Sequence, residues 1–462
     1  MMLQLRRLFF LSTIFMSTVL LSGSYEVQKA GMSQERLDRI APALSKYVSS
    51  GRLPGLITAI ARKGEVVHFE VQGFADLKNS VPLKKDSLFR IYSMSKPITG
   101  VALMILIEEG KVRLSDPVAL YIPEFAQMEV LVINEDGTAS REKQNRPVTI
   151  RDLATHTSGI AYNFTANKEL SKIYNDYKMS PYFSIDDPES LGELLLEEKG
   201  MDIDNLKEFE DICDFSKSLA LKTPLMHQPG FRYTYGMGMD VLGCVIERAS
   251  GKTFNIFLKE RIFGPMDMED TFFSVPKNKS ERFTDLYAFA PALGYLIPSL
   301  AGKLNSKDPI ILIDKRETSP YLSDATVFDG GSGLVSSTQD YLRFSQMLLD
   351  RGKYGDRRIL SRKSVELLSR NHLSDEVLSK NRFPGLQGVG LTVGVDLDKG
   401  LSGTYGSDGT FYWGGAASTI FWIDPVNDLI VIQLRQVLSS PFNNDINSKL
   451  EKIVYSALAD PK

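Results

Sequence analysis

The residues best suited to chemistry in this 462-residue chain are a serine and a lysine three positions apart. Ser93 and Lys96 stand just before an apolar run, Ile98 to Ile107, that we expect to be helical. Residues three apart share one face of a helix, so the lysine amine can lie beside the serine hydroxyl. A helix N-terminus also offers free backbone N–H groups and the positive end of a dipole. The segment therefore predicts a nucleophile, a proton acceptor and part of an oxyanion site.

An S-x-x-K pattern is common by chance, so it needs partners elsewhere in the chain. Two segments can supply them. Tyr235 lies on a predicted loop just before a helix, and a tyrosine near Lys96 can share or relay a proton. The run Trp413-Gly414-Gly415-Ala416 falls in a predicted C-terminal strand. Glycines at a strand edge let the backbone approach a substrate closely.

Taken together, these three segments resemble the motif set of the serine β-lactamase and penicillin-binding-protein superfamily. The motif variants in this chain are most similar to those of its class C and esterase-like branch, and closest in pattern to those of the family VIII carboxylesterases. The resemblance covers roughly residues 33–458 in the family's order. Four further runs resemble that branch: residues 153–159, 240–243, 330–337 and 421–425.

The resemblance implies a role for each motif. Ser93 would attack an acyl carbonyl and form an acyl-enzyme, with Lys96 or Tyr235 as the general base; which of the two remains open. The backbone N–H groups of Ser93 and Ala416 would form the oxyanion hole. No cofactor is implied. The sequence contains neither an HExxH metal pattern nor the G-x-S-x-G of a Ser-His-Asp hydrolase, and His156 is interpreted as structural.

Two departures from the motifs bear on the substrate. Trp413 replaces the lysine that would pair with a β-lactam carboxylate, and Met237 replaces an asparagine that contacts an acylamino group. With Gly414 and Gly415, these residues are the expected substrate contacts. We therefore expect a carboxylesterase or acyltransferase acting on small uncharged esters. The alternatives are a β-lactamase, D-aminopeptidase or DD-peptidase, or a binding protein that keeps the fold without turnover.

Composition limits the other possibilities. The net charge is −3, which gives no indication of a nucleic-acid partner, so the expected partner is a small ester or amide. Cys213 and Cys244 are the only cysteines, too few for a disulfide scaffold or a cysteine-rich metal site. Two unpaired buried thiols are the favoured interpretation, with one disulfide as the alternative. The sequence leaves the oligomeric state open.

The N-terminus reads as a secretory signal. Arg6 and Arg7 precede an apolar run, Leu8 to Leu21, and then small residues. We expect a signal peptide over residues 1–24, a hydrolase domain over 25–462, and a secreted or periplasmic protein. No cysteine suited to a lipid anchor lies nearby, and no later stretch is apolar enough to span a membrane.

The remaining patterns predict elements that position the motifs. Strands are expected near both chain ends and helices between them, which predicts an α/β fold of the α+β type. Its antiparallel sheet would be built from both termini and flanked by helices, as in the β-lactamase and transpeptidase fold. Residues 161–227, where acidic residues outnumber basic ones, read as an inserted helical region. That insertion is either a lid or a solvated acidic face. Expected strands are 56–61, 66–71, 391–395, 409–423 and 429–434; expected helices include 32–50, 148–155, 341–349 and 444–458.

Overall fold

The structure is a computed structural model that describes residues 27–179, 209–289, 310–380 and 386–459. The expected signal peptide and residues 180–208 of the expected insertion lie outside the described residues. Within the described ranges, no helix combines the length and apolar character needed to cross a membrane.

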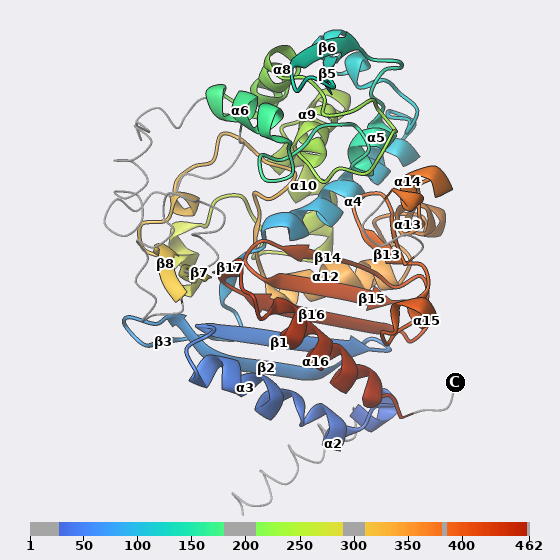
Figure 1. Ribbon diagram of the computed structural model, residues 1–462. Coiled ribbons are helices and arrows are strands. Elements are labelled where there is room, and N and C mark those ends of the chain that lie inside the picture. Colours follow the sequence, from blue (N-terminus) through green and yellow to red (C-terminus); the bar gives the residue numbers. More distant parts are fainter. Residues whose placement is uncertain (1–26, 180–208, 290–309, 381–385, 460–462) are drawn as a thin grey trace, which may run out of the picture.

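One eight-stranded antiparallel sheet organises the described chain, and strands from both termini build it, as expected (Figure 1). Strand β1 pairs with β16, so the first and last long strands lie side by side at its centre. The strands, in sheet order, are β12 (Gln387–Val389), β13 (Gly394–Asp396), β14 (Phe411–Gly415), β15 (Thr419–Asp424), β16 (Leu429–Arg435), β1 (Gly55–Arg62), β2 (Glu65–Asp76) and β3 (Val81–Pro82).

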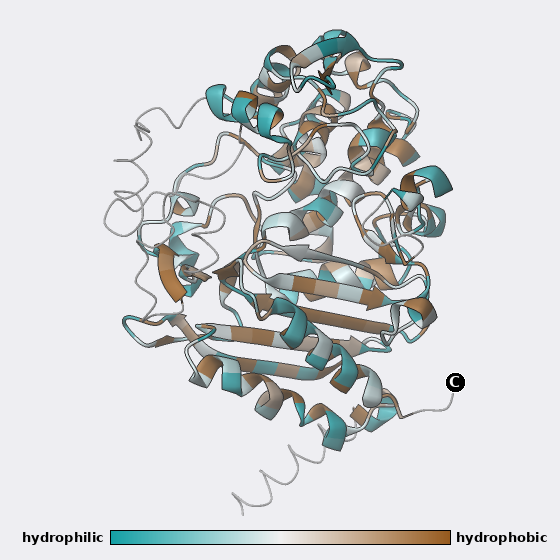
Figure 2. Ribbon diagram, in the orientation of Figure 1, coloured by the Kyte–Doolittle hydropathy of each residue, from teal (hydrophilic) through white to brown (hydrophobic). Residues whose placement is uncertain are grey.

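Helices cover both faces of this sheet. Every residue of β1 is buried, and successive side chains alternate between two cores. Leu56 and Ile60 pack with α2 (Gln34–Leu37), α3 (Ile40–Ser49) and α16 (Asn443–Ser456). Ile57 and Ala59 belong to the larger core, which contains α4 (Ser95–Glu108) and α12 (Thr338–Leu349). Burial on both faces explains why the central strands are almost continuously apolar (Figure 2).

Helix α4 is the centre of the larger core. All residues from Ser95 to Leu106 are buried, which is expected of a helix that is apolar on every side. It lies between the sheet and a second group of helices (Figure 1). That group contains α5 (Ile150–Ala154), α6 (Lys168–Asp176), α8 (Ile212–Lys222), α9 (Gly238–Ser250) and α10 (Phe254–Leu258). Smaller helices are α13 (Arg362–Leu368), α14 (Asp375–Ser379) and α15 (Lys399–Ser402).

The middle of the chain also contains strands, contrary to the expectation of helices alone. Three short sheets occur there: β5 (Glu129–Ile133) with β6 (Ala139–Lys143), β4 (Leu88–Arg90) with β9 (Val335–Ser337), and β7 (Leu286–Phe289) between β8 (Ile310–Asp314) and β17 (Val437–Leu438). Strand β6 is exposed throughout and polar, so it lacks the alternation that marks a half-buried strand. Strands β4 and β9 are too short to show an alternation of apolar and polar residues. A further pair joins β10 (Lys353–Tyr354) to β11 (Arg357–Arg358).

Two expected C-terminal strands have different bounds. The expected strand 409–423 is two strands, β14 and β15, separated by a tight turn in which Ser418 has a φ of 68°. The turn contains alanines and a serine instead of the usual Asn-Gly signal, so the sequence pattern predicts one continuous strand. The expected strand 391–395 begins only at Gly394, because Thr392 has a φ of 73°.

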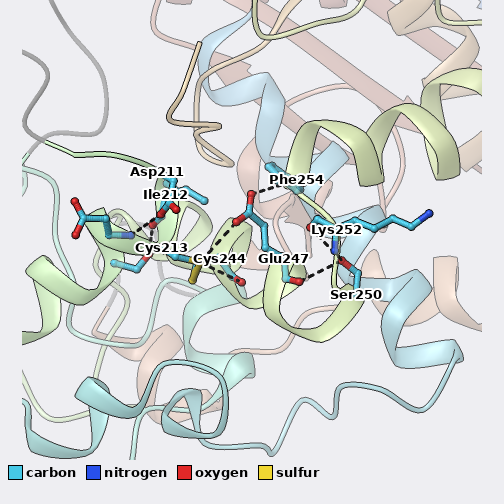
Figure 3. Close-up of a disulfide and its surroundings, with 10 residues drawn as sticks. Asp211, Ile212, Cys213, Cys244, Glu247, Ser250, Lys252 and Phe254 are labelled. Atoms are coloured by element: carbon cyan, nitrogen blue, oxygen red, sulfur yellow. Dashed lines mark hydrogen bonds between the residues drawn. A yellow bond between two sulfur atoms is a disulfide. The ribbon is translucent and has the colours of Figure 1, made fainter.

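The expectation of two free thiols is wrong. Cys213 of α8 and Cys244 of α9 form a disulfide in the second helix group (Figure 3). The two helices pack together and bring the two Cα atoms to 4.8 Å, a distance that a disulfide spans. The sequence separation of 31 residues carries no sign of this helix packing.

Candidate active site

Ser93 lies in a single 3-10 turn, Tyr92–Met94, that leads directly into α4. Tyr92 and Met94 are buried while Ser93 is half-buried, so the serine is the part of this turn that a ligand can reach. Tyr92 has a φ of 43°, which is unusual for a residue with a bulky side chain. Such backbone is held by the packing around it and is concentrated at functional sites.

Lys96 is fully buried beneath Ser93. Its Nζ donates to Ser93 Oγ at 3.0 Å and to the carbonyl oxygen of Gly331 at 2.7 Å. The amine also lies over the rings of Tyr162 and Tyr235, at 5.2 and 4.9 Å from their centroids. Contacts from three separate segments therefore aim this amine at the serine hydroxyl.

Tyr235, on the loop before α9, is the third member of the expected group. Its hydroxyl donates to Ser93 Oγ at 2.7 Å, and its carbonyl accepts from Thr165 Oγ1 at 2.7 Å. Ser93 Oγ thus has both an amine and a phenol within hydrogen-bonding distance. Either of these groups, when deprotonated, can take the serine proton during attack on a carbonyl.

The third motif borders this group from strand β14. A side chain at Gly415 would put its Cβ 2.3 Å from the carbonyl oxygen of Ile91, so the strand passes the serine turn at a distance that only glycine allows. Ala416, which is exposed, follows at the start of the hairpin turn, and no described residue accepts a hydrogen bond from its backbone N–H. An N–H group without a partner, beside the serine turn, has the character needed in an oxyanion hole.

Trp413 and Met237, both expected substrate contacts, differ in their surroundings. Trp413 is half-buried, with its ring centroid 5.9 Å from that of Tyr235. Met237 is only 1% exposed and packs in the larger core at the start of α9. Its side chain therefore offers no open surface to a substrate, which contradicts the expectation. Spacing from Tyr235 could not reveal this, because the loop turns into a helix at that residue.

His156 lies in the same cluster, although its sequence context indicates only a structural turn. Its ring stacks on Trp413 with 6.1 Å between centroids and lies 4.7 Å from the ring of Tyr235. Its Nδ1 accepts from the backbone N–H of Gly236 at 3.2 Å. Burial, and then the nearby Lys96 charge, hold the pKa of His156 well below its ordinary value. A neutral imidazole thus supports the loop that carries Tyr235.

Two aromatic residues at the site have no counterpart among the sequence motifs. Tyr162 is buried against Lys96 and stacks on Phe164, with centroids 5.2 Å apart and planes 10° apart. Phe164 is 68% exposed, and its ring lies 6.3 Å from that of Tyr235. The only sequence feature that pointed to these two residues is that they follow soon after the 153–159 run. Together with Trp413 they give the site an aromatic border.

Among the described residues, no group of three His, Cys, Asp or Glu side chains is arranged to hold a metal ion.

Comparisons with known proteins fit this geometry. A family model described as Beta-lactamase matches residues 38–453. Protein Rv1367c of Mycobacterium tuberculosis is 31% identical over 411 residues, covering 87% of this chain and 90% of that protein. Esterase EstB of Burkholderia gladioli is 26% identical over 424 residues, covering 90% and 95%.

A solved structure supports the fold assignment. The chain is similar to EstCE1, described as a hydrolase with promiscuous acyltransferase activity, with a TM-score of 0.71 and 22% identity. The match covers 91% of this chain and 99% of that one. The mixed fold, an antiparallel sheet flanked by helices, is therefore that of the β-lactamases and transpeptidases.

Proposed function

The chain belongs to the β-lactamase family and is a carboxylesterase-like serine hydrolase, and we propose that it acts through a Ser93 acyl-enzyme on small uncharged esters. The observation that carries this proposal is the convergence of Lys96 Nζ and Tyr235 OH on Ser93 Oγ, at 3.0 and 2.7 Å. A serine hydroxyl becomes a useful nucleophile when a neighbouring base takes its proton.

The proposed reaction has two steps. In the first, Ser93 Oγ bonds to the acyl carbon while its proton passes to the Lys96–Tyr235 pair. The pair then protonates the departing alcohol, whose bond to the acyl carbon breaks. In the second, water or another alcohol bonds to the acyl carbon and gives its proton to the pair; the bond from the acyl carbon to Ser93 Oγ breaks, and the pair returns the proton to Ser93. The backbone N–H groups of Ser93 and Ala416 are proposed to stabilise the oxyanion in both steps.

The character of the border supports an uncharged substrate. Trp413 and the exposed Phe164 present aromatic surface, and position 413 carries no cation that would pair with a substrate carboxylate. The similarity to Esterase EstB supports an ester in preference to a β-lactam. Trp413, Gly414 and Gly415 are the proposed substrate contacts.

The proposal is tested by comparing kcat/KM for p-nitrophenyl butyrate and nitrocefin with the same preparation. We expect a clear preference for the ester, and loss of both activities in Ser93→Ala. A preference for nitrocefin would instead indicate a β-lactamase.

Export from the cytoplasm is part of the proposal. The charged and apolar pattern of residues 1–24 supports a cleaved signal peptide, and the Cys213–Cys244 disulfide supports an oxidising compartment. N-terminal sequencing of the protein exported by a bacterial host tests this point. A mature chain that begins near residue 25 is expected; an intact N-terminus in the cytoplasm would contradict export.

A further inference from the structure

One buried histidine contacts four consecutive residues of the loop that carries Tyr235. The carbonyl oxygen of His156 accepts from the backbone N–H of Thr234 at 2.7 Å, and its Nδ1 accepts from that of Gly236 at 3.2 Å. Its ring lies edge-on to the ring of Tyr233, with centroids 5.7 Å apart, and 4.7 Å from the ring of Tyr235. His156 therefore binds the backbone on both sides of the tyrosine.

The histidine is itself held firmly in place. Its φ is 56°, in the left-handed region, and such backbone persists only where the surroundings fix it. Its N–H donates to the carbonyl oxygen of Leu153, near the end of α5, at 3.3 Å. The side chain is 1% exposed, and its ring stacks on Trp413 of β14 with planes 8° apart. A helix and a strand of the site thus fix the residue that contacts the loop.

The imidazole presents its unprotonated nitrogen to the loop. A backbone N–H can only donate, so Nδ1, which accepts from Gly236, carries no proton. The ring is neutral, because burial, and then the nearby Lys96 charge, hold the pKa of His156 well below its ordinary value. Its proton is therefore on Nε2, a buried atom for which no described residue is an acceptor. A phenyl ring would avoid the cost of this unpaired N–H, so packing alone does not account for a histidine here.

The position of the Tyr235 hydroxyl depends on the same loop. The hydroxyl donates to Ser93 Oγ at 2.7 Å. Only glycine fits at position 236, where a Cβ would lie 2.0 Å from the carbonyl oxygen of Ile160, on the segment that follows His156. A displacement of the loop would lengthen the bond to Ser93, and misplacing a reacting group by about 1 Å can cost on the order of a hundredfold in rate.

We propose that His156 is a positioning residue of the acyl-transfer site, which holds the Tyr235 hydroxyl against Ser93 Oγ through its own Nδ1 and carbonyl oxygen. The inference rests on the proposed function, in which the Lys96–Tyr235 pair serves Ser93. His156 forms no hydrogen bond with Ser93 or Lys96, so it acts through the loop. Loss of its acceptor should therefore lower kcat and leave KM nearly unchanged.

The test compares His156→Asn with His156→Leu, two substitutions of nearly the same shape that both remove the ring stacked on Trp413. In asparagine, Oδ1 occupies the place of Nδ1 relative to Cγ and can still accept from Gly236, whereas leucine has no acceptor. The measurements are kcat and KM for p-nitrophenyl butyrate and the rate constant for labelling with a fluorophosphonate. In His156→Leu, kcat and the labelling rate constant should fall about tenfold or more, with KM within about twofold. His156→Asn should recover most of that loss.

A merely structural role would give a different result. Damage to packing lowers the fraction of the protein that labels, which the final extent of labelling measures, and it affects both variants alike because both lose the same ring. His68→Leu is the matched control, since His68 Nε2 is also buried without an acceptor among the described residues. His68 pairs with Ile60, on the sheet face that packs with α2, α3 and α16. This variant should leave kcat and the labelling rate constant unchanged.

A double-mutant cycle tests the coupling to Tyr235. Tyr235→Phe removes the hydroxyl that donates to Ser93 and keeps the ring that His156 contacts. Because His156 acts through that hydroxyl, His156→Leu should slow labelling by less than about twofold in the Tyr235→Phe background. Equal factors in the two backgrounds would mean that the residues act independently, and would overturn the inference.

The outcomes separate this inference from the proposed function. A wild type that labels on Ser93, with equal rate constants in His156→Asn and His156→Leu, would overturn the positioning role alone. Should Tyr235→Phe label too slowly to measure, that comparison decides. Should His156→Leu fail to fold, His156→Gln takes its place. The glutamine oxygen lies one bond further out, so this variant should label about fivefold or more slowly than His156→Asn, and equal rates would again overturn the inference. A wild-type protein that never labels would instead refute the proposed function, and this inference with it.

Discussion

Trp413 packs against both His156 and Tyr235, at the position where the resemblance to the β-lactamases would place a lysine. Its ring stacks on the imidazole, with planes 8° apart, and its neighbour Tyr235 binds Ser93 Oγ. A single position therefore affects both the apolar border and the packing of the tyrosine. Under the proposed function, Trp413 determines whether the site prefers an ester or a β-lactam.

Replacing Trp413 with lysine should raise the nitrocefin to p-nitrophenyl butyrate ratio of kcat/KM by about tenfold or more, equivalent to about 1.4 kcal/mol. The new cation can pair with the lactam carboxylate. Trp413→Phe, which keeps an aromatic ring, is the control and should leave the ratio nearly unchanged. Equal ratios in the two variants would show that the charge at this position does not decide selectivity.

Phe164 gives a second prediction for single residues. Removing its exposed ring in Phe164→Ala should lower kcat/KM about threefold to tenfold for p-nitrophenyl hexanoate, because buried apolar contact is lost. The acetate ester, whose acyl chain is shorter, should change less. Tyr405→Ala removes another exposed aromatic residue, 51% exposed on the loop before β14, and serves as control. The same loss for both chain lengths would argue against an acyl contact at Phe164.

At the scale of elements, the site depends on how α4, α9 and β14 meet. The sequence predicts these elements because each carries a strong local pattern: an apolar helix after Ser93, a helix after Tyr235 and a glycine-containing strand. It does not predict their packing. The contacts of Gly331 with Asp240, the burial of Met237 and the stacking of His156 on Trp413 all join residues that are distant in sequence.

The same limit applies to the fold. The strands expected at 56–61 and 66–71 and the helix expected at 148–155 rest on local signals, and all three are confirmed as β1, β2 and α5. The hairpin turn at residues 416–418 and the exposed strand β6 carry no local signal. The disulfide likewise depends on the packing of α8 on α9, which no local pattern reveals.

The Cys213–Cys244 disulfide should stabilise the part of the chain that leads to Tyr235. It closes a loop with a sequence separation of 31, for which chain entropy predicts about 3–4 kcal/mol of stabilisation. The double variant Cys213→Ala/Cys244→Ala should therefore unfold at lower urea concentration. Reductant should lower the midpoint of wild type and leave the variant unchanged. A wild-type midpoint that does not respond to reductant would mean that the two thiols are unpaired in solution.

At the scale of the whole molecule, neutral histidines in separate regions make the fold sensitive to acid. Burial lowers the pKa of His68 and of His227 to about 4. His227 Nε2 lies 2.9 Å from Thr234 Oγ1, and Thr234 precedes Tyr235 in the chain. The protonation state of His227 therefore also affects the active site. In the unfolded chain these histidines bind a proton near pH 6.5, whereas in the folded chain they bind one only near pH 4.

Stability should consequently fall as pH decreases. Above pH 6.5 His227 is neutral in both states and its contribution is complete; between about pH 6.5 and 4 the free energy of unfolding drops by about 1.4 kcal/mol per unit from this residue. His227→Gln, which cannot titrate, should flatten the dependence by that amount in urea unfolding at several pH values. An unchanged slope in the variant would show that His227 is not held neutral in the folded protein.

The most direct test of the central claim is the mass of the protein after reaction with a fluorophosphonate, followed by peptide mapping. The account predicts one adduct on Ser93 in wild type, none in Ser93→Ala, and labelling slowed about a hundredfold or more in Lys96→Ala, since the base is lost. A wild-type protein that acquires no adduct, or carries it on another residue, would contradict a serine hydrolase built around Ser93 and would favour a binding protein of the same fold.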